Sequence, residues 1–169
     1  NNFVSIFNAK NLEGWTKLSG NALFYVEDSS IIGKSKPGHT DSFLCTNNIY
    51  KDFILEFDFL SSNDNSGVQF RSHKEKWYYG GRIYGLQYEI DPSDRSWSGG
   101  LYYEPKGGWL YDLSANEEAC AAYNKDKWNH GRILANGPHI ITWINEVECS
   151  HIITNDTNAG FIALQVHLT

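Results

Sequence analysis

The chain contains 169 residues, of which 41% are hydrophobic and 20% are charged, a composition typical of one globular domain. Its formal net charge of −6 excludes a nucleic-acid partner, because phosphate contacts need an excess of Lys and Arg. No apolar run reaches the roughly 20 residues of a membrane-spanning helix, so no transmembrane segment is expected. Aromatic residues make up 15%, more than one core requires, which indicates a surface that binds flat or ring-shaped ligands.

Apolar and polar residues alternate with period two along most of the chain, which predicts β-strands. In chain order, the first two are expected within residues 24–34 and turn at residues 28–30. The next strand, over residues 53–59, alternates most clearly and places its Phe side chains and Leu55 on one buried face. Further strands are expected over residues 66–72, 84–91, 100–104, 128–135, 139–145 and 161–168, the last with Ile162, Leu164 and Val166 facing inward.

One helix interrupts the strands. Ser114 and Glu117 have the spacing of a capping box, and an alanine-rich stretch follows them. A short helix is therefore expected over residues 115–123. Nine strands, one helix and the lack of a linker predict a single domain over residues 1–169, an all-β antiparallel jelly-roll sandwich.

Cysteine and histidine spacing defines neither a disulfide framework nor a metal site. Cys45, Cys120 and Cys149 cannot all pair, and we expect them to be small buried side chains. His and carboxylate residues form no closed ligand set. A divalent metal that polarises a substrate ketone stays open as an alternative.

Polar side chains that suit sugar binding share one face of several predicted strands. In residues 84–91, Gln87, Glu89 and Asp91 oppose the apolar positions. Gln, Glu, Arg, His and Tyr bind sugars and transfer protons, whereas Thr, Lys and Ser are typical of a merely solvated face, which is the alternative. The candidate binding residues are Asn65, Gln69, Arg71, Gln87, Tyr102, Glu104 and Gln165, together with Trp97 and Trp109, one of which is expected to stack on a sugar ring.

Glu89 and Asp91 are candidate acid–base residues. Residues two apart on a strand have Cα atoms roughly 6.5 Å apart, so both carboxyl groups can serve one ligand. Two close carboxylates also raise each other's pKa, which suits one of them to transfer protons. The alternative is an ion pair with Arg71, Arg82 or Arg95.

One long segment and six shorter ones resemble a known family. The long segment is GRIYGLQYEIDPSDRSWSGGLYYEPKGGWL, over residues 81–110. The shorter ones are IFNAKNLEGW (6–15), FLCT (43–46), NSGVQFR (65–71), WN (128–129), TWIN (142–145) and GFIALQVH (160–167). In this order they are similar to the 3-keto-disaccharide hydrolase domain family, formerly a domain of unknown function.

The resemblance implies a concanavalin-like jelly roll, in agreement with the alternation. It also implies action on oligosaccharides or glycosides in the bacterial periplasm or outside the cell, with surface anchoring of a full-length precursor. The implied reaction cleaves a glycoside whose sugar a separate oxidoreductase has first oxidised to the 3-ketone.

The chemistry of a 3-keto sugar assigns roles to the candidates. The ketone acidifies the C2 hydrogen, so a base can remove it and expel the C1 substituent, after which water adds. We expect Glu89 or Asp91 to be this base, the other orienting a sugar hydroxyl or a metal. His167 is the candidate acid for the leaving oxygen, because histidine transfers protons near neutral pH. Arg71 is expected to stabilise the enolate.

The sequence departs from the family pattern at four places. Ala9 and Glu146 stand where a Gly is usual, and Gly131 stands where an aromatic residue is common. The sequence also ends just after the GFIALQVH motif, where relatives continue through another strand. The domain is therefore expected to lack its final strand.

Two other functions compete with the family reading. A retaining glycosidase of the laminarinase kind needs a Glu-x-Asp-x-Glu strand, which Glu89 and Asp91 begin but Ser93 breaks. A non-catalytic carbohydrate-binding module on the same scaffold is the second alternative, because a fold does not fix a function.

Overall fold

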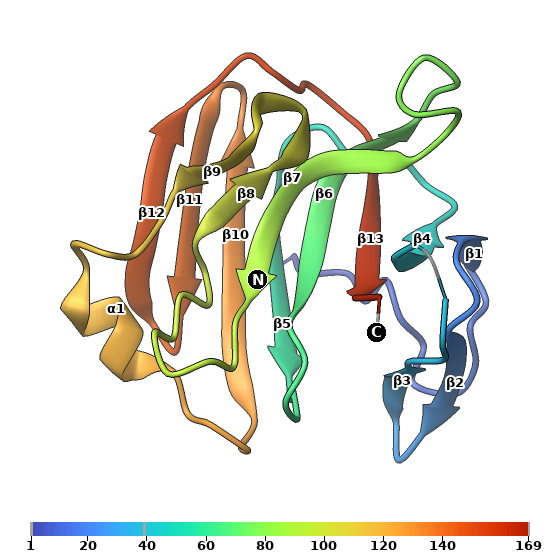
Figure 1. Cartoon of the computed structure of the whole chain (residues 1–169), viewed down its shortest axis with the longest axis horizontal. Coiled ribbons are helices and arrows are strands. Elements are labelled where there is room, and N and C mark those ends of the chain that lie inside the picture. Colours follow the sequence, from blue (N-terminus) through green and yellow to red (C-terminus); the bar gives the residue numbers. More distant parts are fainter. Residues whose placement is uncertain (1, 39, 169) are drawn as a thin grey trace.

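The computed structural model describes residues 2–38 and 40–168, and within them two antiparallel sheets pack face to face (Figure 1). The large sheet, as far as the described residues show it, orders its strands β1 (Trp15–Ser19), β4 (Ser42–Thr46), β13 (Phe161–Val166), β6 (Ser66–Lys74), β7 (Ile83–Ile90), β8 (Leu101–Tyr103) and β9 (Gly108–Tyr111). The small sheet orders β12 (Val147–Ile153), β11 (His139–Ile144), β10 (Asn129–Asn136) and β5 (Phe53–Phe59). A separate hairpin joins β2 (Leu23–Glu27) to β3 (Ser30–Lys34). This arrangement confirms the predicted all-β jelly-roll sandwich.

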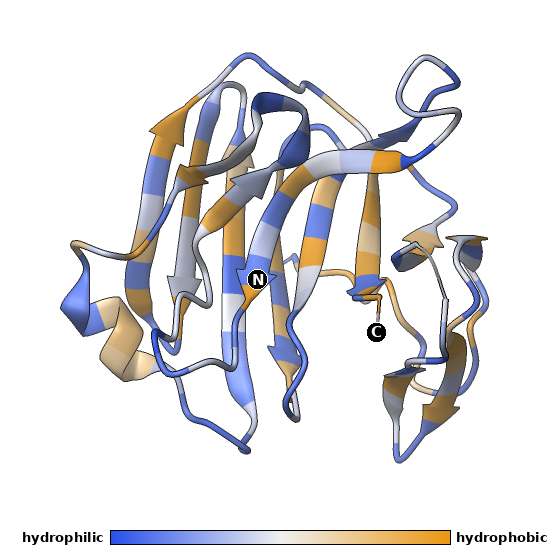
Figure 2. Cartoon of the chain, viewed as in Figure 1, coloured by the Kyte–Doolittle hydropathy of each residue, from blue (hydrophilic) through white to orange (hydrophobic). Residues whose placement is uncertain are grey.

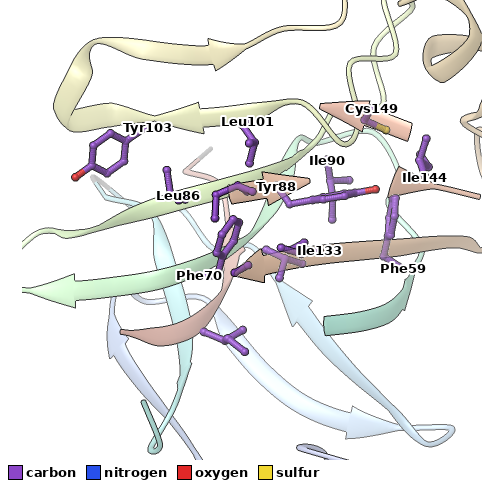
Figure 3. Packing of buried hydrophobic residues seen from close by; sticks show 14 of the residues in the cluster. Phe59, Phe70, Leu86, Tyr88, Ile90, Leu101, Tyr103, Ile133, Ile144 and Cys149 are labelled. Atoms are coloured by element: carbon purple, nitrogen blue, oxygen red, sulfur yellow. The ribbon is translucent and has the colours of Figure 1, made fainter. Parts of the chain in front are cut away.

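The core lies between the two sheets. Alternation of hydropathy along the strands gives each sheet one apolar face (Figure 2). Tyr88 of β7 lies at the centre of this core, in a cluster with Phe59, Ile133 and Ile144 of the small sheet (Figure 3). Its ring is 5.1 Å from that of Phe57, and its hydroxyl donates a hydrogen bond of 2.9 Å to a backbone carbonyl. Because Tyr88 packs inward, its strand neighbours must face outward.

All nine expected strands are present, and four more were missed. β4 is buried at every position, and its sequence, SFLCT, shows no alternation of polar and apolar residues that would reveal it. β12 begins directly after the turn at Asn145 and Glu146, where a Gly signal is missing. β1 and β9 are short edge strands with weak patterns.

The residues that depart from the family pattern differ in backbone conformation or in packing from what the usual residue would allow. Ala9 and Glu146 have φ of 61° and 70°, in the left-handed region that favours glycine. Asn145 precedes Glu146 with φ of 46°, so both residues of this tight hairpin turn are left-handed. At Gly131, a Cβ would lie 2.4 Å from the ring of Phe57 on the paired strand. Phe57 therefore fills the space that an aromatic side chain at 131 would take.

The single α-helix of the described residues, α1 (Glu117–Ala122), is shorter than expected and has a different cap. The side chain of Asn116, rather than that of Ser114, accepts the hydrogen bond from the amide of Ala119. Ser114 instead donates to Asp112, so the capping-box prediction is wrong. A 3-10 turn, η1 (Glu104–Lys106), follows β8. Neither helix of the described chain is long and apolar enough to cross a membrane.

The three cysteines confirm the sequence expectation. Cys45 and Cys149 are buried, Cys120 is half-buried, and all three are free thiols. The sandwich is therefore held together by its core rather than by disulfides.

Candidate functional site

A groove of about 230 Å³ runs over the outer face of the large sheet, opposite the core. It has this position because successive side chains of β7 point to opposite faces of the sheet. Leu86 and Tyr88 face the core, so Gln87 and Glu89 face the groove. Most of the predicted binding residues meet here. The lining includes Asn65, Gln69, Gln87, Glu89, Tyr102, Glu104, Trp109, Gln165 and His167.

Glu89 is buried in the groove floor, with 4% of its surface exposed. Its two carboxylate oxygens accept hydrogen bonds of 2.8 Å from Gln87 and 2.7 Å from Asn65. Burial raises the pKa of Glu89 from 4.5 to about 7, and the hydrogen bond from Gln87 only partly offsets this effect. A carboxyl group with this pKa can give and take a proton at neutral pH.

A chain of amides holds Glu89 in place. Gln87 uses its second N–H to donate to Gln165 at 3.2 Å, and Gln165 donates to Asp41 at 3.0 Å. The carbonyl oxygen of Gln87 accepts from Gln69 at 3.3 Å. Glu89 and Asp41 can only accept hydrogen bonds when they are ionised. They therefore fix the direction in which the amides between them donate their hydrogen bonds. Gly67 makes room for it, since a Cβ there would lie 2.6 Å from the Gln87 side chain.

Asp91 is placed differently from Glu89, although both were expected to face one ligand. It follows the end of β7 and accepts hydrogen bonds from the amides of Ser93 and Trp97 and from Arg95 Nε, the last at 2.7 Å. Burial raises its pKa, but the bonds from Ser93 and Arg95 outweigh burial and leave the pKa below its ordinary value. Asp91 is therefore a fixed anion that orients Arg95, not a residue that exchanges protons.

Arg95 lines the groove and was not predicted as a site residue. Its guanidinium lies 4.3 Å from the ring centre of Trp97 and 5.5 Å from that of Trp109. Only its Nε has a hydrogen-bond partner within the described residues, so its other N–H groups are available to a ligand. Its signal in the sequence is its position four residues after Asp91, although the sequence suggested Arg95 only as one of three possible ion-pair partners of the two carboxylates.

Trp97 and Trp109 occupy different positions. Trp109 lines the groove, wedged edge-on between Tyr102 and Trp97 with centroid distances of 5.4 Å to each. Trp97 lines a second hollow instead, and Arg95 covers one face of its ring. Of the two residues expected as alternatives to stack on a sugar ring, Trp109 lies in the groove and Trp97 does not.

Arg71 lies outside the groove, which corrects its predicted place beside Gln69. A bulge in β6 between Phe70 and His73 breaks the alternation, and Arg71 adopts φ of 48°. Its buried guanidinium donates to the carbonyls of Lys51, Gly137 and Thr157 and pairs with Asp52 at 3.2 Å. The side chain joins three loops and cannot reach a ligand in the groove.

The groove rim carries further charged and titratable groups. His167, which follows β13, is exposed at one side, and Arg82 pairs with Glu104 at 2.9 Å at another. Asp41, the acceptor at the end of the amide chain, was missed because the strand it precedes has no alternating pattern. Across the part of the chain that the structure describes, no cluster of three His, Cys, Asp or Glu side chains could hold a metal ion.

Solved structures with this fold include carbohydrate-binding and carbohydrate-cleaving proteins. The carbohydrate binding module CBM66 from Bacillus subtilis aligns with a TM-score of 0.68 and 17% identity, over 91% of this chain and 88% of that chain. A candidate glycosyl hydrolase from Parabacteroides distasonis aligns with a TM-score of 0.69 and 17% identity, over 97% of this chain and 87% of that chain. A β-1,3-1,4-glucanase (lichenase) from a mouse hindgut metagenome aligns with a TM-score of 0.57 and 10% identity, over 96% of this chain and 82% of that chain. Comparison with curated protein sequences gave no match.

The fold places this chain among the jelly-roll sandwich domains. Its sequence matches the family model described as 3-keto-alpha-glucoside-1,2-lyase-like domain over residues 2–169. The chain belongs to this family, the 3-keto-disaccharide hydrolase family that its motifs resemble.

Proposed function

We propose that this domain cleaves 3-keto-glycosides by eliminating the C1 substituent, with Glu89 as the base. The observation that carries the proposal is a buried carboxyl group in the floor of a sugar-sized groove, with its pKa raised to about 7. The family match supports the substrate class. The oxidoreductase that would supply the ketone and the periplasmic or extracellular location belong to the same proposal and rest on the family resemblance.

The elimination step needs one base and stabilisation of two oxygens. Glu89 removes the proton from C2, and that electron pair forms the C1=C2 double bond through an enolate on the C3 oxygen. The C1–O bond breaks, and its electron pair leaves on the departing oxygen, which takes up a proton from water. Water then adds across the double bond and gives the free 3-keto sugar, so the sum of both steps is hydrolysis.

Two groups flank Glu89 and suit these two oxygens. His167 follows β13, two strands away from β7 on one side, and Arg95 packs on Trp109 of β9 on the other side. In a pyranose, the C1 oxygen and the C3 oxygen lie on opposite sides of C2. One of the two groups therefore serves the departing oxygen and the other the enolate oxygen. Arg95 takes over the charge-stabilising role that the sequence had suggested for Arg71.

The direct test compares a 3-keto-glucoside with its unoxidised parent. We expect the wild-type domain to cleave only the keto substrate, because the parent has no acidic C2 hydrogen. Its kcat/KM should rise with pH around a midpoint of about 7, as Glu89 loses its proton. Glu89→Gln should lower kcat by about 100-fold or more, the ordinary range for loss of a general base.

Glu56→Gln, on the exposed face of the small sheet, is the matched control and should keep wild-type kinetics. Wild-type turnover by Glu89→Gln would show that Glu89 is not the base. Equal cleavage of both substrates would indicate conventional glycosidase chemistry. Sugar binding without cleavage of either substrate would identify a binding module.

A further inference from the structure

Asn65 lies beside the proposed base and has one polar atom that the steps above do not use. It directly precedes β6, on the same face as Gly67, which pairs with Glu89 across the β6–β7 ladder. Its Nδ2 donates a hydrogen bond of 2.7 Å to Glu89. An ionised carboxylate can only accept hydrogen bonds, so the Asn65 amide turns its nitrogen toward Glu89 and its carbonyl oxygen away. This oxygen, Oδ1, is therefore fixed as an acceptor next to the base.

Among the amides that hold Glu89, only Asn65 offers a ligand a free acceptor within the described chain. Gln87 and Gln165 use their carbonyl oxygens to accept hydrogen bonds from other amides of the groove floor. The carbonyl oxygen of Gln69 has no partner, but it is buried. Asn65 is half-buried and lines the groove, and no group of the described residues donates to its Oδ1. A hydroxyl of a bound sugar can therefore donate to it.

The chemistry of the substrate identifies the hydroxyl that this acceptor can bind. Three oxygens outside the ring are attached to C1, C2 and C3, around the hydrogen that Glu89 removes. The C1 oxygen is a glycosidic ether and the C3 oxygen is a ketone, so neither carries a proton to donate. The hydroxyl on C2 does carry one, and it is bonded to the same carbon as the hydrogen that faces Glu89. It is the donor that matches Asn65.

We propose that Asn65 binds the C2 hydroxyl and makes the domain selective for 3-keto sugars in which this hydroxyl is free. The inference rests on the proposed function, which places C2 at Glu89. Sugars that are 2-deoxy, or that carry a substituent on the C2 oxygen, lack the donor and should be poor substrates. The oxidised residue of the substrate is therefore one to which no other sugar is linked through its C2 oxygen.

One amide group then contacts both partners of the proton transfer. Its Nδ2 holds the carboxylate of Glu89, and its Oδ1 holds the hydroxyl on the carbon that loses the proton. The hydrogen bond from Nδ2 also favours the ionised form of Glu89. Removal of the Asn65 amide should therefore change two measurable quantities, the selectivity at C2 and the pH dependence of the reaction.

The selectivity is measured as the ratio of kcat/KM for methyl 3-keto-glucoside to kcat/KM for its 2-deoxy counterpart. Both substrates have an acidic C2 hydrogen, and comparing the ratio between protein variants cancels their intrinsic difference in reactivity. Asn65→Leu keeps the approximate size of the side chain but removes both polar atoms. We expect it to lower the ratio by about 10-fold, the ordinary effect of losing one such hydrogen bond, and to move the pH midpoint of kcat/KM above the wild-type value.

Asn63→Leu is the matched control, since Asn63 is an exposed asparagine of the same loop and does not line the groove. It should keep the wild-type ratio and midpoint. A wild-type ratio in Asn65→Leu, or an equal loss of kcat/KM for both substrates, would overturn the inference. Neither outcome contradicts Glu89 as the base, which Glu89→Gln tests separately.

If the wild type cleaves neither keto-glucoside, the proposed lyase function fails, and both compounds persist as ligands. Their dissociation constants can then be measured by calorimetry. Tighter binding of the 2-hydroxy compound by the wild type, lost in Asn65→Leu, would support Asn65 as the residue that recognises the C2 hydroxyl. Equal binding of both compounds by the wild type would overturn this recognition as well.

Discussion

Glu89 links the stability of this domain to pH. Its native pKa of about 7 lies above the ordinary 4.5, so the native state binds this proton more tightly than the unfolded chain does. The resulting stability is fully present below pH 4.5 and is lost as the pH rises through 7. The shift corresponds to about 3 kcal/mol when Glu89 is fully ionised.

Urea unfolding of the wild type and Glu89→Gln between pH 5 and pH 9 measures this effect. The free energy of unfolding of the wild type should fall relative to that of the variant as the pH rises. A constant difference between the two proteins across this range would show that the native pKa of Glu89 is not raised.

Glu146 stores strain at the tip of the β11–β12 hairpin. Its φ of 70° costs a side-chain-bearing residue about 1 kcal/mol relative to glycine. Glu146→Gly should therefore raise the free energy of unfolding by about 1 kcal/mol in urea titrations. The control is Glu118→Gly in α1, where glycine lacks this advantage and should destabilise the domain. Destabilisation by both substitutions would contradict the strained turn.

Residue-level reasoning from the sequence identified most of the groove. Strand parity correctly placed Gln69, Gln87, Glu89 and Gln165 on one face because these positions lie on regular strands. It could not separate the environments of Glu89 and Asp91, since the Asp91 partners come from a loop whose path no periodicity describes. Several family motifs proved structural: Asn145 of TWIN donates to Asn129 of WN at 2.9 Å, away from the groove lining.

At the scale of elements, the bulge in β6 determines on which side of the sheet the Arg71 side chain lies. Replacing Arg71 by Met removes a buried cation and leaves three loop carbonyls without their donor. We expect a loss of about 3 kcal/mol in the free energy of unfolding, with sugar binding kept while the domain is folded. Arg82→Met is the comparison in stability, because its exposed pair with Glu104 should contribute under 1 kcal/mol. Loss of sugar binding by a folded Arg71→Met protein would show that Arg71 contributes to the binding site after all.

The strands themselves were predictable where polar and apolar residues alternate along the sequence. β5 and β7 have this pattern in their sequences, and both were found to within one residue of their ends. β4 has no such alternation, and no Gly or Pro in the sequence marks the bulge at Arg71 that shifts the parity of β6. Burial on both faces and local irregularity are tertiary properties, which a period-two pattern does not contain.

At the scale of the whole molecule, the sandwich is shared by proteins of different function. A binding module and a glucanase both align with this chain, so the fold alone does not distinguish binding from catalysis. The proposed catalytic function rests on a few side chains of the large sheet and of the loop after β7: a carboxyl group whose pKa is raised to about 7, the amides that orient it and a cation held by Asp91.

The position of β13 has a consequence for how this chain folds. β13 lies between β4 and β6, so residues 161–166 join two parts of the large sheet that share no other strand pairing among the described residues. The hairpins of β6 to β9 and of β10 to β12 can form from neighbouring residues, but the large sheet closes only when this distant segment arrives. Closing so long a loop is entropically costly, and folds dominated by such contacts reach the native state in milliseconds to seconds. Until then Gln165 is missing from its place between Gln87 and Asp41, so the amide chain beneath Glu89 is completed only with the last closure of the sheet.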